Sequence, residues 1–262
     1  GRQLLGAVTY AFTGYSLMIG GHHPFFLLPM IWFPLLLVGI DRILRGHGWQ
    51  LLGWVTGLAI LSNFYFAYIL GLGSLVYAVI RFWSLKQQGL LAVKWPVALR
   101  RFLLAAVSGI LLAGILLIPS LLMMLKSTRV GTIFANGLWL YPGSYYLKLA
   151  NAVLTTGSEP TYWAVFGMSG VTFFGCVYVL RHWRENRPLV LTLVLMAVGL
   201  LFPAGAAFFN VLSTPSNRWL LLAAGPFGLA TMVLSDHLNG LTKRDRYWLA
   251  GSAIGLLLVV YA

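Results

Sequence analysis

The feature that most constrains this chain is a succession of long apolar runs, separated by short connectors that carry most of its basic residues. Of its 262 residues, 60% are hydrophobic and only 9% are charged. Soluble domains average about 25% charged residues, so a soluble chain of this composition could not cover its surface with polar groups. A helix crosses the roughly 30 Å hydrocarbon core with about 20 apolar residues. The sequence therefore predicts an all-α, polytopic transmembrane helical bundle.

We expect about nine membrane segments in a single transmembrane domain over residues 1–262. They run approximately over Leu4–Gly20, Phe25–Ile40, Trp49–Leu61, Phe64–Phe82, Phe102–Leu122, Tyr162–Leu180, Pro188–Phe208, Trp219–Leu234 and Tyr247–Ala262. Residues 125–161 form the one sizeable loop, and its aromatic and polar side chains predict interfacial helices or re-entrant pieces. The chain begins at Gly1 and ends inside an apolar run. We therefore expect it to be cut from a longer protein at both ends.

The basic residues follow a sidedness pattern. Fourteen of the eighteen lysines and arginines fall in alternate connectors, and the exceptions are Lys126, Arg129, Lys148 and Arg218. Cytoplasmic loops of membrane proteins are enriched in lysine and arginine. We therefore place the basic connectors inside and the four exceptions on the noncytoplasmic side. The net charge of +13 would suggest nucleic acid if it lay on a soluble face, but here it flanks apolar spans, so no nucleic-acid partner is expected.

One apolar run requires a choice between a single helix and a hairpin. The chain carries no charged residue between Arg45 and Arg81. A single helix over Trp49–Phe82 would be about 51 Å long, far beyond the hydrocarbon core, and would separate the two arginines. A hairpin that turns near Ser62–Asn63 keeps both on one side. We therefore predict the hairpin.

The hairpin turn is the first candidate site. It places the amide of Asn63 and the phenol of Tyr65 inside an apolar run. Burying an unpaired carboxamide costs about 1–3 kcal/mol, so Asn63 needs partners. Either Asn63 and Tyr65 line a polar cavity and contact a ligand, or they form a capped helical turn with interfacial aromatic rings.

Two further runs carry candidate residues. His22 and His23 precede Pro24, and they either contact substrate or lie in a wet loop at a helix start. Adjacent histidines do not share a helix face and no carboxylate is near in sequence, so we expect no metal site. No Gly-rich phosphate loop or Cys/His ligand set is present, so no cofactor is expected.

Arg218 lies in the run Thr214–Trp219 and contradicts the sidedness trend. A guanidinium binds phosphate in a bidentate way, and at a membrane boundary a lipid phosphate is the obvious partner. The alternative is an arginine that snorkels to headgroups. Lys126 and Arg129 are expected on the same side, where they either add to an anion-binding patch or serve as interfacial anchors.

Five runs together carry a family resemblance: Gly6–Phe12, His23–Phe26, Met30–Ile40, Leu61–Tyr68 and Ser216–Trp219. The most specific is the Ser-Asn-Phe-Tyr-Phe element that begins at Ser62 within the hairpin. In combination these runs resemble the bacterial YfhO-type membrane proteins over about residues 4–234. Members of that family are far longer than this chain.

The resemblance implies a multi-pass protein of the bacterial cytoplasmic membrane, related to the GT-C class of glycosyltransferases. Such proteins transfer a sugar from a polyprenyl-phosphate donor on the outer face, here to a cell-envelope polymer such as teichoic acid. Their acidic catalytic residue usually lies in the first outer loop, a region that would precede Gly1. We therefore expect no catalytic residue in this chain. The supporting, substrate-binding residues implied are His23, Asn63, Tyr65, Asn217 and Arg218.

Two alternatives to an enzyme stay open. One is a transporter or flippase of a lipid-linked or polar solute, although the predicted helices carry essentially no ionisable residues near their middles. The other is a noncatalytic membrane scaffold that assembles envelope glycosylation proteins. In each case the expected partners are membrane lipids, with the polyprenyl-phosphate sugar donor added if the chain belongs to an enzyme.

Overall fold

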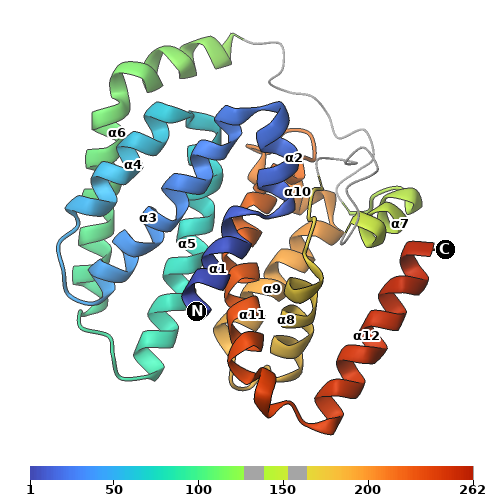
Figure 1. Cartoon of the computed structure of the whole chain (residues 1–262). Coiled ribbons are helices and arrows are strands. Elements are labelled where there is room, and N and C mark those ends of the chain that lie inside the picture. The colour runs from blue at the N-terminus through green and yellow to red at the C-terminus, as the bar shows by residue number, and fades with distance from the viewer. Residues whose placement is uncertain (127–138, 153–163, 262) are drawn as a thin grey trace. The chain divides into compact units, whose positions relative to one another are not determined.

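The computed structural model describes residues 1–126, 139–152 and 164–261 (Figure 1). Within these ranges the ordered elements are helices and no β-strand occurs, which confirms the predicted all-α class. The helices are α1 (Arg2–Ala11), α2 (Gly14–His22), η1 (Pro24–Leu27), α3 (Leu28–Leu44), α4 (Gln50–Ser62), α5 (Phe64–Gln87), α6 (Trp95–Leu125), α7 (Gly143–Ala152), α8 (Gly170–Arg181), α9 (Arg187–Leu201), α10 (Pro203–Phe209), η3 (Asn217–Ala223), α11 (Ala224–His237), η4 (Leu238–Gly240) and α12 (Lys243–Tyr261).

The contacts of the chain group it into two compact units. Unit 1 combines Gly1–Pro24 with Phe134–Ala262, and unit 2 is the intervening stretch Phe25–Ile133. Unit 2 is therefore inserted in the sequence of unit 1. Each unit has its own set of packed helices, which we describe separately.

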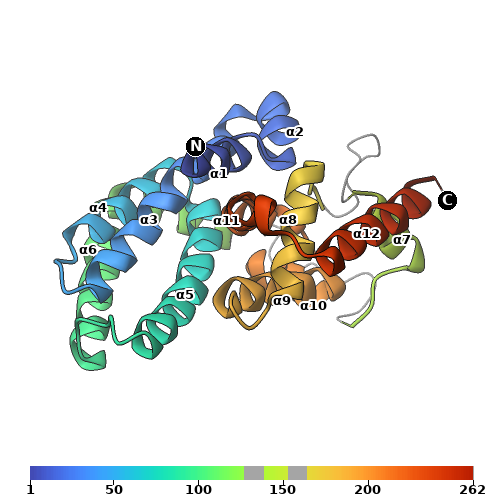
Figure 2. The ribbon, with the colours of Figure 1, turned by 60° about the horizontal axis from the view of Figure 1, so that its bottom comes forward.

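In unit 2, α4 packs against α3, α5 and α6, and Figure 1 and Figure 2 both show it beside α3 and α6. The approach of α4 to α6 is close because glycines line it. A Cβ atom added at Gly53 would lie 2.5 Å from Ser108 Oγ, and one added at Gly57 would lie 2.5 Å from Leu112 Cδ2. The Gly53-x-x-x-Gly57 spacing is thus a helix-packing contact, as such spacings are in membrane helices.

The predicted hairpin is confirmed. The helix breaks at Asn63, between α4 and α5. The Nε atoms of Arg45 and Arg81 both lie 2.6 Å from a carboxylate oxygen of Asp41, which brings the two arginines to the same end of unit 2. This is possible only because α5 returns along the direction from which α4 came.

In unit 1, α11 packs against both α1 and α8. Small residues again allow the close approach. A Cβ atom added at Gly228 would lie 2.8 Å from Gly6 O, and one added at Gly175 would lie 2.6 Å from Ala230 O. α11 is therefore the central helix of this unit, and its neighbours leave no room for larger side chains at these positions.

The basic connectors of unit 1 also meet at one end. Arg2 Nε lies 2.7 Å from Asp236 Oδ1, near the C-terminal end of α11. The C-terminal end of α8 reaches the same place, because the Tyr178 ring stacks on His237 with 5.5 Å between centroids. An ion pair between α8 and α12, described below, adds a third connector. Connectors that the charge pattern predicts on one side therefore share one end within each unit.

Two predicted segments are broken rather than continuous. Leu4–Gly20 is divided into α1 and α2 at Thr13, whose Oγ1 accepts a hydrogen bond from Ser16 N at 3.4 Å. Pro188–Phe208 is divided into α9 and α10, which are bent by 105° at Pro203. A capping hydroxyl starts a new helix in the first case, and a proline that lacks an N–H ends the old one in the second.

Four stretches of the described chain are long and apolar enough to cross a membrane. They are Pro24–Leu44, Phe64–Gln87, Trp95–Met123 and Asn217–Gly240. The α9–α10 pair would be a fifth if it forms one bent span, whereas α4 and α8 are apolar but short. The predicted helix at Tyr162–Leu180 begins only at Gly170. The count of nine membrane segments is therefore not confirmed.

Candidate functional site

The candidate site in unit 1 is built on the break between α9 and α10. The last four carbonyls of a helix lack partners within it, and Pro203 cannot donate to them. Tyr145 OH donates to Leu200 O at 3.0 Å, and Tyr146 OH donates to Leu201 O at 3.1 Å. Two tyrosines of α7 thus satisfy the carbonyls that the break exposes, and they hold α7 against the end of α9.

Asn217 extends this network to η3. It is completely buried. Its Nδ2 donates to Tyr145 OH at 3.3 Å, and its Oδ1 accepts from Trp219 Nε1 at 3.1 Å. An unpaired buried amide would cost about 1–3 kcal/mol, so these bonds fix both the side chain and the backbone that carries it. The predicted substrate-binding residue Asn217 therefore joins α7 to the start of η3.

Aromatic rings enclose the network. Tyr141 stacks on Tyr145 with 3.9 Å between centroids, and Phe209 stacks on Trp219 with 4.9 Å between centroids. Tyr141, Tyr145 and Trp219 are all buried. Burial raises the pKa of the Tyr145 phenol well above its usual range, so this hydroxyl stays a neutral hydrogen-bond donor at physiological pH.

Arg218 lies between two fixed neighbours, the buried Asn217 and Trp219. Its own side chain is half-buried, and its Nε atom is buried. Ser216, on the other side of Asn217, is 7% exposed, and its Oγ makes no hydrogen bond within the described part of the chain. The guanidinium is therefore presented by a rigid segment, and guanidinium groups bind phosphate or carboxylate through a planar fork of N–H donors.

His23 is exposed at the C-terminal end of α2, where its backbone N–H donates to Ile19 O at 2.7 Å. Helix α2 packs against η3, the element that carries Asn217 and Arg218. The structure therefore brings the helix of His23 to the element that bears the arginine. A contact between His23 and a substrate stays a prediction.

In unit 2, Asn63 is the N-cap of α5. Its Oδ1 accepts from Tyr65 N at 3.1 Å and from Phe66 N at 3.2 Å. The Tyr65 ring lies edge-on to Phe66 at 5.2 Å, and Phe66 in turn contacts Phe26 at 4.8 Å. This is the capped turn with aromatic neighbours that the sequence offered as one of two readings, and a ligand role for Asn63 and Tyr65 stays a prediction.

The predicted site residues are distributed over both units. Those in unit 1 are His23, Asn217 and Arg218. Those in unit 2 with described positions are Asn63, Tyr65 and Lys126. Lys126 is exposed just after the end of α6, and Arg129 lies outside the described residues.

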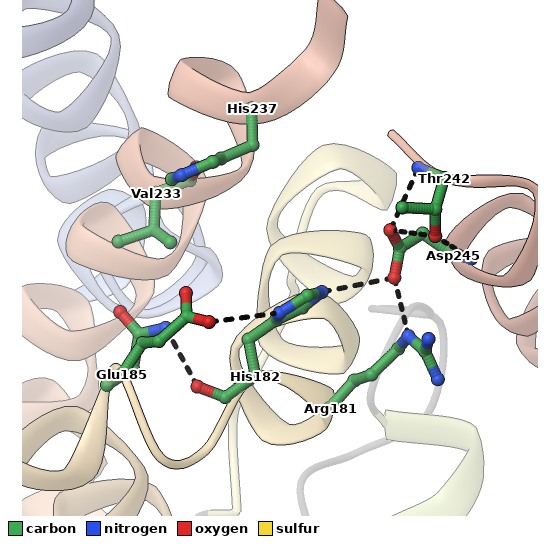
Figure 3. A network of polar contacts seen from close by, with 8 residues as sticks. Arg181, His182, Glu185, Val233, His237, Thr242 and Asp245 are labelled. Carbon is green, nitrogen blue, oxygen red and sulfur yellow. Dashed lines mark hydrogen bonds and ion pairs between the residues drawn. The ribbon is translucent and has the colours of Figure 1, made fainter. Parts of the chain in front are cut away.

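Sequence analysis did not single out a second polar cluster, which joins α8 to α12 (Figure 3). At its centre is Asp245, whose side chain is only 3% exposed. Its Oδ1 accepts from Arg181 Nε at 2.5 Å and lies 3.1 Å from His182 Nε2. Its Oδ2 accepts from Thr242 N at 3.0 Å and from the Thr242 hydroxyl. The Thr-x-x-Asp spacing of a capping box was the sequence signal for part of this cluster.

The hydrogen bonds of this cluster indicate a structural role for Asp245. Burial disfavours the charged form of Asp245, but hydrogen bonds from Thr242, Arg181 and His182 outweigh burial and hold the pKa of this carboxyl well below its usual range. The carboxylate is therefore ionised at neutral pH and fully engaged by donors. Such a group is a poor general base, because taking up a proton would break these bonds. We conclude that Asp245 fixes the start of α12 against α8.

The chemistry that the described residues offer is limited and specific. Among them, no three His, Cys, Asp or Glu side chains gather in a way that could hold a metal ion. The site around Arg218 combines one cation with an amide, hydroxyls and aromatic rings. It is suited to binding an anion beside an apolar group, and its described residues include no carboxylate that would activate an acceptor hydroxyl.

The helices of membrane-spanning length define the chain as a helical membrane protein. Its sequence matches the family described as bacterial membrane protein YfhO over residues 2–262, so the chain belongs to the YfhO family. It is 24% identical over 271 residues to the uncharacterized protein YfhO of Bacillus subtilis (strain 168). That alignment covers 98% of this chain but 28% of the relative, so the chain spans little more than a quarter of that protein's length. No solved structure matches.

Proposed function

We propose that this chain is part of a membrane glycosyltransferase that moves a sugar from a polyprenyl-phosphate donor to a cell-envelope polymer such as teichoic acid. One observation carries the proposal: Arg218 is held between the buried residues Asn217 and Trp219, in a loop that contradicts the charge sidedness of the chain. An arginine fixed at such a boundary, on the side opposite to most of the basic residues, is accounted for by an anionic ligand. A lipid phosphate is the anion that a membrane places there.

In this proposal, Arg218 binds the donor phosphate and stabilises the negative charge that develops on it as the sugar leaves. Asn217 positions the arginine through its bonds to Tyr145 and Trp219. His23 approaches the same segment on α2 and donates to the sugar. The general base that deprotonates the acceptor comes from parts of the full-length protein beyond this chain.

The proposal includes a multi-pass topology in the cytoplasmic membrane, with a GT-C-like arrangement of about nine segments. Its support is that the basic connectors meet at one end within each unit, as the Asp41 and Asp236 ion pairs illustrate. With that end inside, the loop that carries Arg218 faces outward. The bent α9–α10 pair then counts as one segment whose second half, α10, turns along the membrane surface.

The test is sugar transfer by the full-length protein in liposomes, measured at donor concentrations below and above KM. Arg218→Ala should lower kcat/KM for the donor about 100-fold, because it removes a charge-assisted bidentate contact. Arg218→Lys should recover part of the loss, since it restores the charge without the fork. Lys148→Ala is the matched control, an exposed basic residue on the same predicted side. An Arg218→Ala variant with unchanged transfer at low donor concentration would refute the phosphate role.

A second function, movement of a lipid-linked solute across the membrane, is favoured by the 105° bend between α9 and α10. Transporters often build their binding sites at broken helices of this kind. Flipping of a fluorescent polyprenyl-phosphate sugar in liposomes, with no transfer product, would support it. A full-length protein that does neither, but copurifies with a separate transferase, would instead be a scaffold.

A further inference from the structure

The segment from the end of α10 to the first two residues of η3, residues 210–218, which we call the 210–218 loop, is closed at its base. Phe209 precedes it and Trp219 follows it, and their rings stack with 4.9 Å between centroids. Arg218 is the last residue of this loop, and Val211 and Leu212 lie near its start. Because the stack brings the two ends together, the arginine and the two apolar side chains belong to one short segment with joined ends.

The backbone of this loop is strained. Val211 and Leu212 have φ angles of 56° and 54°, in the left-handed region that β-branched and bulky residues rarely adopt. Such a residue persists in this conformation only where its surroundings enforce it. Here Leu212 N donates to Ala207 O at 2.8 Å, and Asn210 Nδ2 donates to Thr214 O at 2.7 Å. These bonds hold the loop in its unfavourable conformation.

The strain does not serve packing. Val211 is 43% exposed and Leu212 is 69% exposed, so neither side chain fills a core. Glycine or asparagine would take the same backbone conformation at lower cost. The conformation therefore has one visible effect, which is to present two apolar side chains on the loop that also presents Arg218.

We propose that the 210–218 loop recognises an amphiphile in which a phosphate adjoins a hydrocarbon chain. Arg218 binds the phosphate, and Val211 and Leu212 contact the hydrocarbon next to it. This inference rests on the proposed function and makes it more specific. The donor is selected through its lipid as well as its phosphate, so a prenyl phosphate binds and inorganic phosphate does not compete.

The geometry of α10 supports this assignment. It is bent by 105° from α9, so a membrane-crossing α9 directs α10 and the following loop along the bilayer surface. At that depth phosphate groups and the first carbons of lipid chains are adjacent. Partial burial of two apolar side chains against such a chain corresponds to about a tenfold gain in affinity.

The test compares two soluble probes of different chain length, farnesyl monophosphate and dimethylallyl monophosphate, with inorganic phosphate as a third arm. Their dissociation constants are measured on the full-length protein in nanodiscs. The key variant is Val211→Gly with Leu212→Gly, which keeps the left-handed backbone and removes both side chains. We expect its Kd for farnesyl monophosphate to rise about tenfold and its Kd for the dimethylallyl probe to rise only about threefold, because a five-carbon chain covers less of the two side chains. Its Tm should be unchanged or higher.

Two further variants separate the possible failures. Val211→Asn with Leu212→Asn tolerates the same backbone and should repeat the glycine result. Arg218→Ala should weaken both prenyl probes alike. If Arg218→Ala changes neither, the proposed function fails. If it weakens both while the paired variants leave the chain-length ratio at its wild-type value, only the inference about the loop fails. Paired variants that lower Tm and weaken both probes equally would also overturn it, because the side chains would then serve folding.

Discussion

The two ends of unit 1 solve the problem of a buried polar group in opposite ways. At one end, which we call the ionic end, the carboxylate of Asp245 is engaged by Arg181 and its neighbours. At the other, which we call the amide end, the neutral side chain of Asn217 is engaged by Tyr145 and Trp219. Both groups are almost completely buried, and both join elements that are far apart in the sequence.

The difference between the two ends shows where the chain places negative charge. Of the four carboxylates in the described part of the chain, three are in ion pairs with arginines at basic connectors: Asp41, Asp236 and Asp245. The fourth, Glu185, lies 3.8 Å from His182 at another basic connector. At the amide end, Asn217 fixes its segment without adding a negative charge next to Arg218. A carboxylate there would compete with an anionic ligand for the guanidinium. The choice of amide over acid is therefore what an anion-binding role requires.

The largest expected effect comes from removing the charge at the ionic end. Asp245→Asn should lower the free energy of unfolding of the full-length protein by about 3 kcal/mol, because Arg181 and His182 lose a buried partner. SDS titration in mixed micelles measures this. The matched control is Asp236→Asn, which removes an ion pair that is largely exposed. Equal effects of the two variants would mean that burial does not distinguish these pairs.

The same carboxylate gives a pH dependence. The pKa of Asp245 is lowered in the fold from an ordinary value of 3.8. The stabilisation is therefore fully present above about pH 5 and is lost progressively as the pH falls below the ordinary value. Wild-type stability should decline in this acidic range, and Asp245→Asn should decline less. Parallel acid limbs for the two proteins would contradict the assignment.

The reciprocal change at the amide end should have the next largest effect. Asn217→Asp should destabilise the full-length protein by about 2 kcal/mol at neutral pH, because it buries a charge among neutral partners. The cost should shrink as the pH falls and the new carboxyl takes up a proton. The same variant should weaken phosphate binding at neutral pH. SDS titration and probe binding at two pH values check both, and a fully tolerated acid would remove the distinction between the ends.

A smaller effect is expected when only one partner of the amide is removed. Tyr145→Phe should cost about 1 kcal/mol, because Asn217 Nδ2 and Leu200 O each lose a hydrogen bond. Tyr146→Phe serves as the control, since Tyr146 is less buried and its hydroxyl bonds to Leu201 O and Tyr141 N rather than to Asn217. Both are measured by SDS titration. A larger loss of unfolding free energy for Tyr146→Phe would show that the main stabilising hydrogen bonds of this end do not involve Asn217.

The smallest effect belongs to the exposed pair of Arg2 and Asp236. Arg2→Ala should change the free energy of unfolding by about 0.5 kcal/mol or less, because surface ion pairs gain little in water. What remains should vanish at high salt. A loss as large as that of Asp245→Asn would show that this pair is not exposed in the membrane.

The hairpin could be predicted from the sequence because one polar residue interrupts an otherwise apolar run. Asn63 interrupts an apolar run, and a helix length of about 51 Å excluded the alternative to a turn. The same arithmetic placed Arg45 and Arg81 at one end, where the structure joins them to Asp41. In these cases a single local signal was sufficient, because the membrane allows few alternatives.

The breaks within Leu4–Gly20 and Pro188–Phe208 were not predicted, because the local signals for them are weak and lie inside apolar runs. Thr13 and Pro203 each start a new helix, yet the hydropathy around them is continuous. A hydroxyl three residues before its backbone partner and a proline are known boundary signals, but both also occur within membrane helices. The continuous hydrophobic pattern therefore predicted unbroken helices, although Thr13 and Pro203 are residue types that can begin a new helix.

For the site, the uneven distribution of basic residues identified Arg218 as a candidate, but it did not identify the residues that hold Arg218 in position. The bond from Asn217 to Tyr145 joins residues 72 positions apart, so no local pattern contains it. The left-handed conformation of Val211 and Leu212 has no sequence signal either, because these residue types disfavour it. Tertiary contacts enforce both features, which is why they became visible only in the structure.

The insertion of unit 2 within unit 1 has a consequence for the order in which the protein is made. A chain emerges from the ribosome N-terminus first. Asp41 meets Arg45 within one helical turn and Arg81 only 40 positions later, so unit 2 completes its contacts early. Arg2, by contrast, is synthesised 234 positions before its partner Asp236. Helix α1 therefore enters the membrane long before the helix that packs against it exists, and release of the chain before α11 is made would leave it without that neighbour.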